Sequence, residues 1–334
     1  MLAILAAAMP ASSPFSKPRL AYYWRMFLAW WEGEEFDAAA ERARMEAELE
    51  ALREAAGAEE AEEGPVSVAF GHDETYRAKE QEMGDRLRVA EMIWGPGYIH
   101  PGAEETHLEY AKAMRMSGEK SMAVVGLGLG GPAREMSRDT GVWVTGYAWP
   151  KTVADAAREQ CKTAGMAKKV EVVDFDPDND ELPKGKYAGL ICLAELGFVQ
   201  KKAALIKQMF ESLKKGGAFL VTDYVVEEGA KVAGFDPSWG TPNFWTEEKY
   251  KTVIQKCGFD FRVGEDLTKD HLALIVEAWK DWKRIVEGIK SANLDDETKA
   301  RMLKILVAEA NLWADRQEAL RSGALRYFRF FGMK

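Results

Sequence analysis

The ten residues Met122–Gly131 read MAVVGLGLGG, and they decide the fold of the chain around them. Met122–Val125 is short and apolar, as expected of a buried strand, and a helical pattern starts at Ala133. The glycines between them let the backbone turn sharply and approach a ligand without an intervening Cβ. A helix that starts after such a bend offers unpaired N–H groups and the positive end of its dipole. The stretch therefore predicts a strand, a loop and a helix of the kind that binds a nucleotide-type cofactor.

The glycine spacing alone does not identify the ligand. Gly126-x-Gly128-x-x-Gly131 also satisfies the dinucleotide fingerprint, and glycine pairs occur in ordinary turns. The segments downstream add information, because strand-like runs alternate with helical runs. These strand-like runs are Val142–Tyr147, Val170–Asp174 and Ala188–Leu193. The alternation predicts a parallel sheet covered on both faces.

Composition narrows the classes of function. The 334 residues are 47% hydrophobic, enough for a substantial core, and the formal charge of -9 argues against non-specific binding of nucleic acid. Cys161, Cys192 and Cys257 are widely spaced, with neither metal-ligand spacing nor a disulfide framework. This cysteine usage suits a reducing compartment, so we expect no metal site and a cytoplasmic protein.

The first residues bear on location. Met1–Met9 is apolar, but no basic residues precede it as in a signal peptide, and no segment reaches transmembrane length. Aromatic residues crowd the helical stretch Lys17–Phe36, which favours a lid helix packed on the core. Contact of this helix with a membrane surface stays open as the alternative, because Arg19 and Arg25 lie among the aromatics.

The remaining elements follow from periodicity and from glycine and proline breaks. Helices are expected at Ala38–Glu63, Asp73–Ile93, Glu104–Met116, Lys151–Ala164, Lys201–Lys214 and Glu247–Cys257. Strands are expected at Ala218–Val225 and Phe259–Asp266. From Lys269 onward the pattern predicts helix to the end of the chain.

Several stretches resemble one family. VVGLGLGGPAREMSRDTGVWVTGY resembles the first cofactor motif of class I S-adenosylmethionine-dependent methyltransferases, and Gly130–Arg134 is most similar to the sterol C-methyltransferase branch. IWGPGYIHPGAEETHLEYAKAM is similar to the segment before that motif in phosphoethanolamine-type N-methyltransferases. SLKKGGAFLVTDYVV resembles the late helix–turn–strand unit of the class. The resemblance covers roughly Trp94–Leu267.

The resemblance implies an α/β fold: a Rossmann-like seven-stranded class I methyltransferase sheet with an antiparallel edge hairpin and added N- and C-terminal helices. It implies three parts: an N-terminal helical extension and lid at residues 1–105, the cofactor-binding core at 106–267, and a C-terminal helical segment at 268–334.

The implied cofactor is S-adenosylmethionine. Gly126, Gly128 and Gly130 would lie against its methionine part, and Asp174, or with less support Asp176, would accept from the adenine amino group. The other residues expected to bind it are Tyr147, Trp149 and Glu195. The glycine bend is expected to leave room for this sulfonium nucleoside. The alternative interpretation of Asp174–Asp180 is an acidic surface loop without a binding role.

Two departures from the family pattern stand out. Val124 and Ala148 occupy positions at which the family has acidic residues, the second of which holds the ribose hydroxyls. Loss of a ribose acceptor would cost about 1–3 kcal/mol of binding free energy. Trp149 compensates if it stacks on adenine, although a core tryptophan is the alternative. The departures leave open a methyltransferase-like subunit with weak or no cofactor binding.

Methyl transfer is an in-line displacement that depends on alignment, and a base is needed only when the acceptor carries a proton. His100, Glu195 and Tyr224 are the candidate catalytic residues, from a loop before the sheet and from two strand ends. Tyr98, His107 and Trp245 are the candidate substrate-binding residues. The N-methyltransferases resembled here carry a histidine near the position of Glu195, so their acid–base pairing is in doubt for this chain.

The leading hypothesis is a methyltransferase acting on a small amine, a lipid head group or a lipid-like acceptor. The alternatives are a catalytically degenerate partner or sensor subunit and, third, a nicotinamide-dependent oxidoreductase. Aromatic residues that could roof the acceptor are Trp30, Trp31, Trp239, Phe244 and Trp245. The partner is expected to be a small molecule or lipid, with a homodimer left open by the helical ends.

Overall fold

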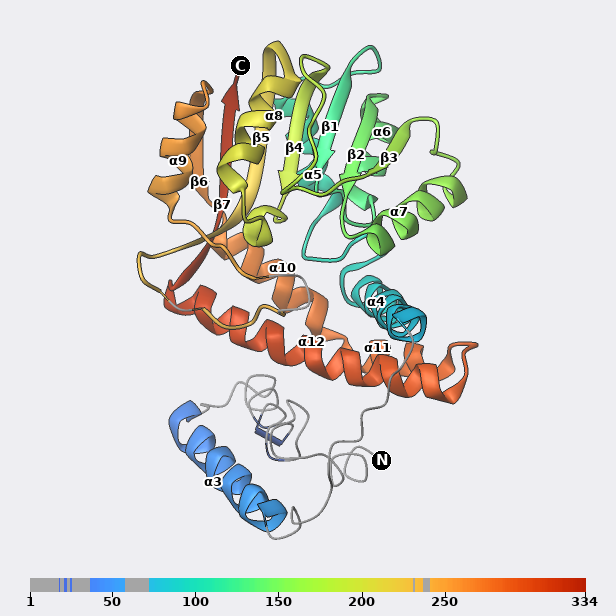
Figure 1. The fold of residues 1–334 in the computed structure, drawn as a ribbon, viewed down its shortest axis with the longest axis vertical. Helices are drawn as coiled ribbons and strands as arrows, with labels where there is room; N and C mark the ends of the chain where they lie inside the picture. Colours follow the sequence, from blue (N-terminus) through green and yellow to red (C-terminus); the bar gives the residue numbers. More distant parts are fainter. Residues whose placement is uncertain are drawn as a thin grey trace.

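A seven-stranded mixed sheet forms the centre of the protein, as seen in a computed structural model that describes residues 18, 21–22, 25, 37–57, 72–230, 232–236 and 241–334 (Figure 1). The strand order is β3-β2-β1-β4-β5-β7-β6. The strands are β1 (Ser121–Val125), β2 (Trp143–Ala148), β3 (Val170–Asp174), β4 (Tyr187–Leu193), β5 (Leu213–Val226), β6 (Asp260–Asp266) and β7 (Leu325–Met333). The predicted seven-stranded Rossmann-like fold is confirmed.

Strands β1 to β5 run parallel, and β7 is antiparallel to both β5 and β6. The order reverses between β1 and β4, because the chain moves outward from β1 to β3 and then returns to the other side of β1. Ligands of open α/β sheets bind beyond the carboxyl ends of the strands at such a reversal. The topology therefore places the ends of β1, β2, β3, β4 and β5 around one candidate site.

Helices cover both faces of the sheet because the strand side chains alternate. Ala123 and Val125 face a core formed with α8 (Lys202–Ser212) and α9 (Glu247–Lys256). Met122 and Val124 face the opposite core, which includes side chains of three helices. Those helices are α5 (Glu104–Ala113), α6 (Gly131–Thr140) and α7 (Lys151–Thr163).

A third core lies below the carboxyl edge of the sheet, where the C-terminal helices pack on an N-terminal one (Figure 1). Val89 and Ile93 of α4 (His72–Trp94) contribute to it. The C-terminal contributors are α10 (Thr268–Lys280), α11 (Trp282–Ser291) and α12 (Asp296–Ser322). This layer forms the floor beneath the strand ends.

The prediction of helix to the end of the chain was wrong. Helix α12 ends at Ser322, with Gly323 at φ +79 as its C-cap, and Leu325–Met333 form β7 between β5 and β6. Aromatic residues favour pleated, half-buried strands, and four of them lie in β7: Tyr327, Phe328, Phe330 and Phe331. The seventh strand therefore comes from the part of the chain that looked wholly helical.

The structure also describes α3 (Ala38–Gly57), which corresponds to most of the predicted helix there. The aromatic stretch predicted at residues 17–36 falls almost entirely outside the described residues, as do Trp30, Trp31 and Trp239. No helix among the described residues is long and apolar enough to cross a membrane. The division at residues 105 and 267 stays a prediction, with the qualification that β7 returns the chain to the sheet.

Candidate functional site

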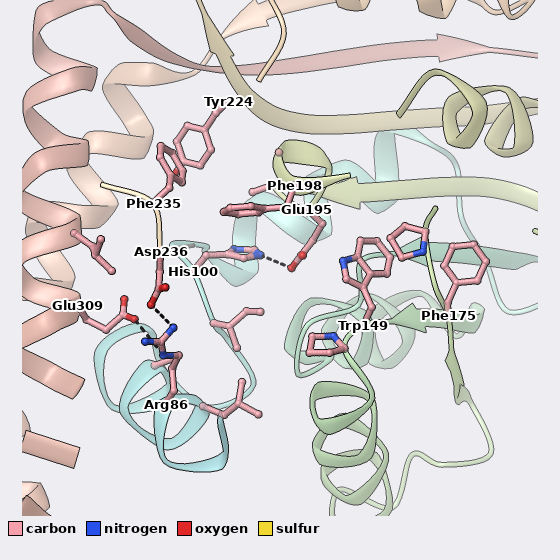
Figure 2. A pocket seen from close by; sticks show the side chains of 18 of the residues that line it. Arg86, His100, Trp149, Phe175, Glu195, Phe198, Tyr224, Phe235, Asp236 and Glu309 are labelled. Atoms are coloured by element: carbon pink, nitrogen blue, oxygen red, sulfur yellow. Dashed lines mark ion pairs between the residues drawn. The ribbon is translucent and has the colours of Figure 1, made fainter. Parts of the chain in front are cut away.

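A cavity of about 680 Å³ lies at the carboxyl edge of the parallel strands (Figure 2). Its wall takes Trp149 from the end of β2, Asp174 and Phe175 from the end of β3, Glu195 from beyond β4, and Tyr224 from β5. The volume suits a nucleoside-sized ligand together with a second small molecule. Five of the predicted site residues line this cavity: His100, Trp149, Asp174, Glu195 and Tyr224.

Two aromatic rings shape one end of this cavity. The rings of Trp149 and Phe175 have centroids 6.2 Å apart and are tilted by 50°. Figure 2 shows both directed toward the same end of the cavity, with the Glu195 carboxylate farther along. A planar heterocycle gains stacking energy and apolar contact on such a surface. No role for Phe175 was predicted from the sequence. Its position as a large apolar residue directly after a strand end could have indicated one.

The acidic residues at the same end are already engaged. The Asp174 carboxylate accepts a hydrogen bond from Arg158 at 2.8 Å and is about half exposed. Asp176 accepts from the side chain of Asn179 and the backbone of Asp178, and these bonds lower the pKa of its carboxyl. Asp174 also pairs in register with Ala148, so it is an acid beside the strand end that lacks one.

The glycine loop differs from the expectation of open space. Gly126, Gly128 and Gly130 have φ of +76, +54 and +76, a region that favours glycine. A Cβ on Gly126 would lie 2.3 Å from Cβ of Glu195, and one on Gly128 would lie 3.3 Å from the Ile99 side chain. The three glycines are buried and are not among the residues that line the cavity. The loop is thus covered by Glu195 and Ile99, and its direct contact with a cofactor stays a prediction.

His100 and Glu195 form a pair in the middle of the cavity. Nε2 of His100 lies 3.5 Å from Oε1 of Glu195, and their side chains are 22% and 17% exposed. Nδ1 of His100 is buried and has no hydrogen-bond partner among the described residues. A buried ring nitrogen without a partner suggests a place where a ligand or water completes the bonding.

Tyr224 lies beyond this pair and has a partner that the sequence did not reveal. Its hydroxyl is 2.8 Å from Nε2 of His271 in α10, and His271 stacks on Tyr327 with centroids 3.8 Å apart. Burial lowers the pKa of His271 well below its usual range, so the ring is neutral. Burial also raises the pKa of the Tyr224 hydroxyl, which is therefore protonated at neutral pH. The pair fixes the Tyr224 ring against the cavity.

The far end of the cavity combines aromatic rings with paired charges (Figure 2). Arg86 of α4 contacts the carboxylate of Asp236 and lies 4.0 Å from that of Glu309 in α12. Phe198, Phe235 and Phe244 form the wall, with the last two rings 4.5 Å apart. We call this region, bounded by those rings together with Tyr224, Asp236 and Glu309, the acceptor end.

Two predicted substrate-binding residues lie behind the cavity wall. The hydroxyl of Tyr98 donates to Glu135 of α6 at 2.5 Å, and Nδ1 of His107 lies 3.3 Å from the same carboxylate oxygen. Tyr98 and His107 are 8% and 5% exposed. This cluster of three residues, which we call the latch, holds the segment that carries Ile99 and His100. The side chains of Tyr98 and His107 do not line the cavity.

Tyr147 and Trp245 are also in the core rather than on the cavity wall. The Tyr147 hydroxyl bonds to that of Tyr187 at 2.6 Å, while its carbonyl accepts from the backbone N–H of Gly126. Tyr147 thus supports the glycine loop through its backbone. The Trp245 ring faces the buried ammonium of Lys202 at 5.0 Å. Direct roles for these two residues stay predictions.

Comparison with known proteins connects the sequence to two groups of methyltransferases. The chain is 25% identical over 194 residues to phosphoethanolamine N-methyltransferase 1 of Zea mays, covering 55% of this chain and 37% of that protein. It is 24% identical over 173 residues to the sterol 24-C-methyltransferase of Yarrowia lipolytica, covering 48% and 45%. The matched region is thus less than half the length of either relative. No protein-family model matches the chain.

Solved structures share the fold. Phosphoethanolamine N-methyltransferase 2 of Haemonchus contortus, in complex with S-adenosyl-L-methionine, superposes with a TM-score of 0.65 at 19% identity. That match covers 81% of this chain and 61% of the other. The [4+2]-cyclase SpnF superposes with a TM-score of 0.60 at 18% identity, covering 77% and 94%. The protein therefore has the class I methyltransferase fold, and its sequence is similar to phosphoethanolamine N-methyltransferases and sterol 24-C-methyltransferases.

Proposed function

We propose that this protein is an S-adenosylmethionine-dependent methyltransferase acting on a small amine, a lipid head group or a lipid-like acceptor. One observation carries the proposal. A single cavity connects the aromatic surface of Trp149 and Phe175, through the His100–Glu195 pair, to the acceptor end. This arrangement gives two ligands adjoining places on the fold that the relatives share, as transfer between them requires.

The residues present fit an adenosyl sulfonium cofactor at the first end. Trp149 and Phe175 offer a surface for adenine, and Asp174 offers a carboxylate beside it. Glu195 offers a negative charge to a sulfonium or ammonium group. For the methionine part to rest on the glycine loop, the side chains of Glu195 and Ile99 must rotate away from Gly126 and Gly128. When bound, the cofactor supplies an electrophilic methyl group.

The chain's own residues then bind and orient the acceptor. The His271 bond holds Tyr224 in one rotamer at the acceptor end, and the neighbouring Phe235 ring packs on it with centroids 5.4 Å apart. The aromatic walls give that end an apolar surface. His100, Glu195 and Tyr224 are the residues proposed to contact the acceptor or its proton, because each lines the cavity and carries a group that can exchange one.

A second candidate is a protein of the same fold that does not transfer methyl groups. Val124 is 2% exposed inside the sheet, and Ala148 is 1% exposed, so neither position offers a polar group to a ribose. The cyclase with the same fold shows that this architecture also carries other chemistry. The missing acids favour this alternative, whereas the aromatic surface and the pair at Glu195 favour the transferase.

Titration calorimetry separates the two candidates. We expect S-adenosylmethionine and S-adenosylhomocysteine to bind with dissociation constants of about 1–100 μM, while reduced nicotinamide dinucleotide should not bind. Trp149→Ala should weaken both by about tenfold or more, because the stacking surface is lost. Trp143→Ala is the matched control, since Trp143 lies at the other end of β2 and is 48% exposed. Absence of binding to either nucleoside would refute the transferase and leave the non-catalytic candidate.

A further inference from the structure

The charge of the cavity wall bears on the class of acceptor. Among the described residues that line the cavity, six carry a carboxylate and three carry an ammonium or guanidinium group. The carboxylates belong to Asp174, Asp176, Asp180, Glu195, Asp236 and Glu309, and the cations to Arg86, Lys151 and Arg316. The wall as a whole is therefore negative, which favours cationic over anionic ligands, whereas at the acceptor end the two carboxylates of Asp236 and Glu309 face the two guanidinium groups of Arg86 and Arg316.

Each of the three cations is already held by the protein. The Lys151 ammonium bonds to Asp155 at 2.5 Å, and Arg86 contacts Asp236. Arg316 donates twice to the carbonyl of Gly234, at 3.1 and 2.6 Å. A phosphate dianion at the acceptor end would have to take a guanidinium from one of these partners while facing nearby carboxylates.

The guanidinium plane of Arg316 also packs against aromatic rings. Its guanidinium carbon lies 3.9 Å from the ring centroid of Trp313 and 4.0 Å from that of Phe235. A stacked guanidinium with its edge on a carbonyl cannot turn to form a bidentate contact with phosphate without losing both interactions. The residue type that most often recognises phosphate is thus built into the wall.

Glu309 is the carboxylate with the weakest pairing at this end. Its side chain is 16% exposed, it accepts from the Trp313 indole N–H at 3.2 Å, and Arg86 is 4.0 Å away. Burial raises the pKa of its carboxyl, although Arg86 and Arg316 oppose the rise. A cation placed between Glu309 and the aromatic wall would gain charge pairing and cation–π contact together.

We propose that the acceptor end binds an amine carried on an apolar or aromatic skeleton, with Glu309, the less strongly paired of its two carboxylates, recognising its charge, and that it excludes phosphorylated amines. The inference rests on the proposed function, because it names the acceptor of the same cavity. The proposed acceptor differs from phosphoethanolamine, the substrate for which the similar N-methyltransferases are named. The aromatic rings of Phe198, Phe235 and Phe244 hold the skeleton.

Calorimetry in the presence of saturating S-adenosylhomocysteine tests the proposal with four probes: octylamine, 1-octanol, ethanolamine and phosphoethanolamine. We expect octylamine to bind at least about tenfold more tightly than 1-octanol, because only the amine pairs with the carboxylates. Ethanolamine should bind weakly because it lacks the skeleton, and phosphoethanolamine should show no heat of binding. Binding of phosphoethanolamine equal to that of octylamine, or equal binding of amine and alcohol, overturns the proposal.

Variants identify the recognising carboxylates. Glu309→Gln keeps the shape of the side chain and should weaken octylamine binding by about tenfold while leaving S-adenosylhomocysteine binding unchanged. Glu318→Gln on the exposed face of the same helix is the matched control and should bind as the wild type does. Asp236→Asn is the second variant, used if Glu309→Gln does not fold. Unchanged octylamine affinity in Glu309→Gln, or in Asp236→Asn where Glu309→Gln does not fold, contradicts the assignment.

These experiments distinguish failure of the proposed function from failure of the proposed acceptor class. If S-adenosylhomocysteine does not bind the wild-type protein, the proposed function fails before the acceptor is tested. If the nucleoside binds and the amine does not, only the acceptor class is overturned.

Discussion

At the scale of single residues, Glu195 is the side chain on which the site most depends. Its carboxylate lies 3.5 Å from the His100 ring, and its methylene groups lie against Gly126. The side chain stands between the two ends of the cavity. Its position allows two opposite effects on cofactor binding. The carboxylate can attract a positively charged cofactor, or its methylene groups can obstruct the glycine loop.

Substitution of Glu195 distinguishes these effects. If the carboxylate pairs with the cofactor, Glu195→Gln should weaken S-adenosylmethionine binding by about tenfold, since a charge-assisted hydrogen bond contributes about 1.5–3 kcal/mol. Calorimetry measures the change, with exposed Glu181→Gln as the control. Tighter binding by Glu195→Ala would show instead that the side chain obstructs the loop.

Tyr224 gives a second prediction at this scale. Tyr224→Phe keeps the ring and removes the hydroxyl that meets His271. If that hydroxyl handles the acceptor proton, kcat should fall by about 10²-fold or more while the cofactor dissociation constant stays the same. Transfer of labelled methyl groups to an accepted amine measures kcat.

The control is Tyr327→Phe, which removes the hydroxyl of the neighbouring strand residue that donates to Thr222. A loss of kcat in Tyr224→Phe no larger than in Tyr327→Phe would assign Tyr224 a packing role only.

At the scale of elements, the segment between α4 and α5 determines how the glycine loop is covered. The backbone N–H of Gly131 donates to the carbonyl of Gly97 at 3.0 Å, and that of Gly97 donates to Glu91 at 2.7 Å. The latch adds the bonds of Tyr98 and His107 to Glu135. These contacts place Ile99 over Gly128 and His100 beside Glu195, although none of the latch side chains lines the cavity.

The latch predicts an effect at a distance. Glu135→Gln should lower the free energy of unfolding by about 1–3 kcal/mol, because it weakens two partly buried hydrogen bonds. It should also raise KM for the cofactor more than it lowers kcat, since the segment over the loop loosens. Urea unfolding and steady-state kinetics measure the two effects, with exposed Glu105→Gln as the control.

The sign of the pH effect follows from the same contacts. Burial alone would raise the pKa of Glu135, but the hydrogen bonds from His107 and Tyr98 outweigh it and lower the pKa. The latch therefore stabilises the fold above the pKa of an unfolded glutamate, and that contribution disappears as the pH falls through the lowered value. Equal acid unfolding of wild type and Glu135→Gln would contradict this role.

At the scale of the whole molecule, a buried ion pair connects the sheet to the segment between β5 and α9, which contains Phe244. The ammonium of Lys202 donates to the carbonyl of Asn243 at 2.6 Å and lies 3.8 Å from the carboxylate of Asp223, and both charged side chains are fully buried. Burial lowers the pKa of Lys202 to about 8, although Asp223 opposes the shift. The wall at Phe244 thus depends on a buried charge that does not itself line the cavity.

The linkage predicts how stability changes with pH. Between pH 8 and 9.5 an unfolded lysine keeps its proton while folded Lys202 releases it, so the free energy of unfolding rises with pH. The rise from this residue should be about 1–2 kcal/mol and should be absent in Lys202→Met. Urea unfolding across that range measures it. Exposed Lys201→Met should follow the wild-type curve, and a wild-type slope in Lys202→Met would disprove the linkage.

Local patterns determined most of the fold. The glycine loop and the alternation of strands and helices could be inferred because side-chain periodicity is a local property, whereas the seven-stranded sheet was implied by the family resemblance. The resemblance, together with the convergence of strand ends at one edge of a parallel sheet, led to Trp149, Asp174, Glu195 and Tyr224. Strand β7 could not be inferred, because its aromatic residues follow a long helix and pair only with distant strands.

Only the tertiary structure decided what faces the cavity. Arg86, Asp236 and Glu309 come from three distant parts of the chain and meet because α4 and α12 pack below the sheet. Neighbouring elements cover four other predicted residues, which therefore lie behind the cavity wall: Tyr98, His107, Tyr147 and Trp245. Apart from β7, the sequence alone determined which elements form around the site and where the parallel strands end. Long-range packing, which no local pattern encodes, decided which side chains meet there.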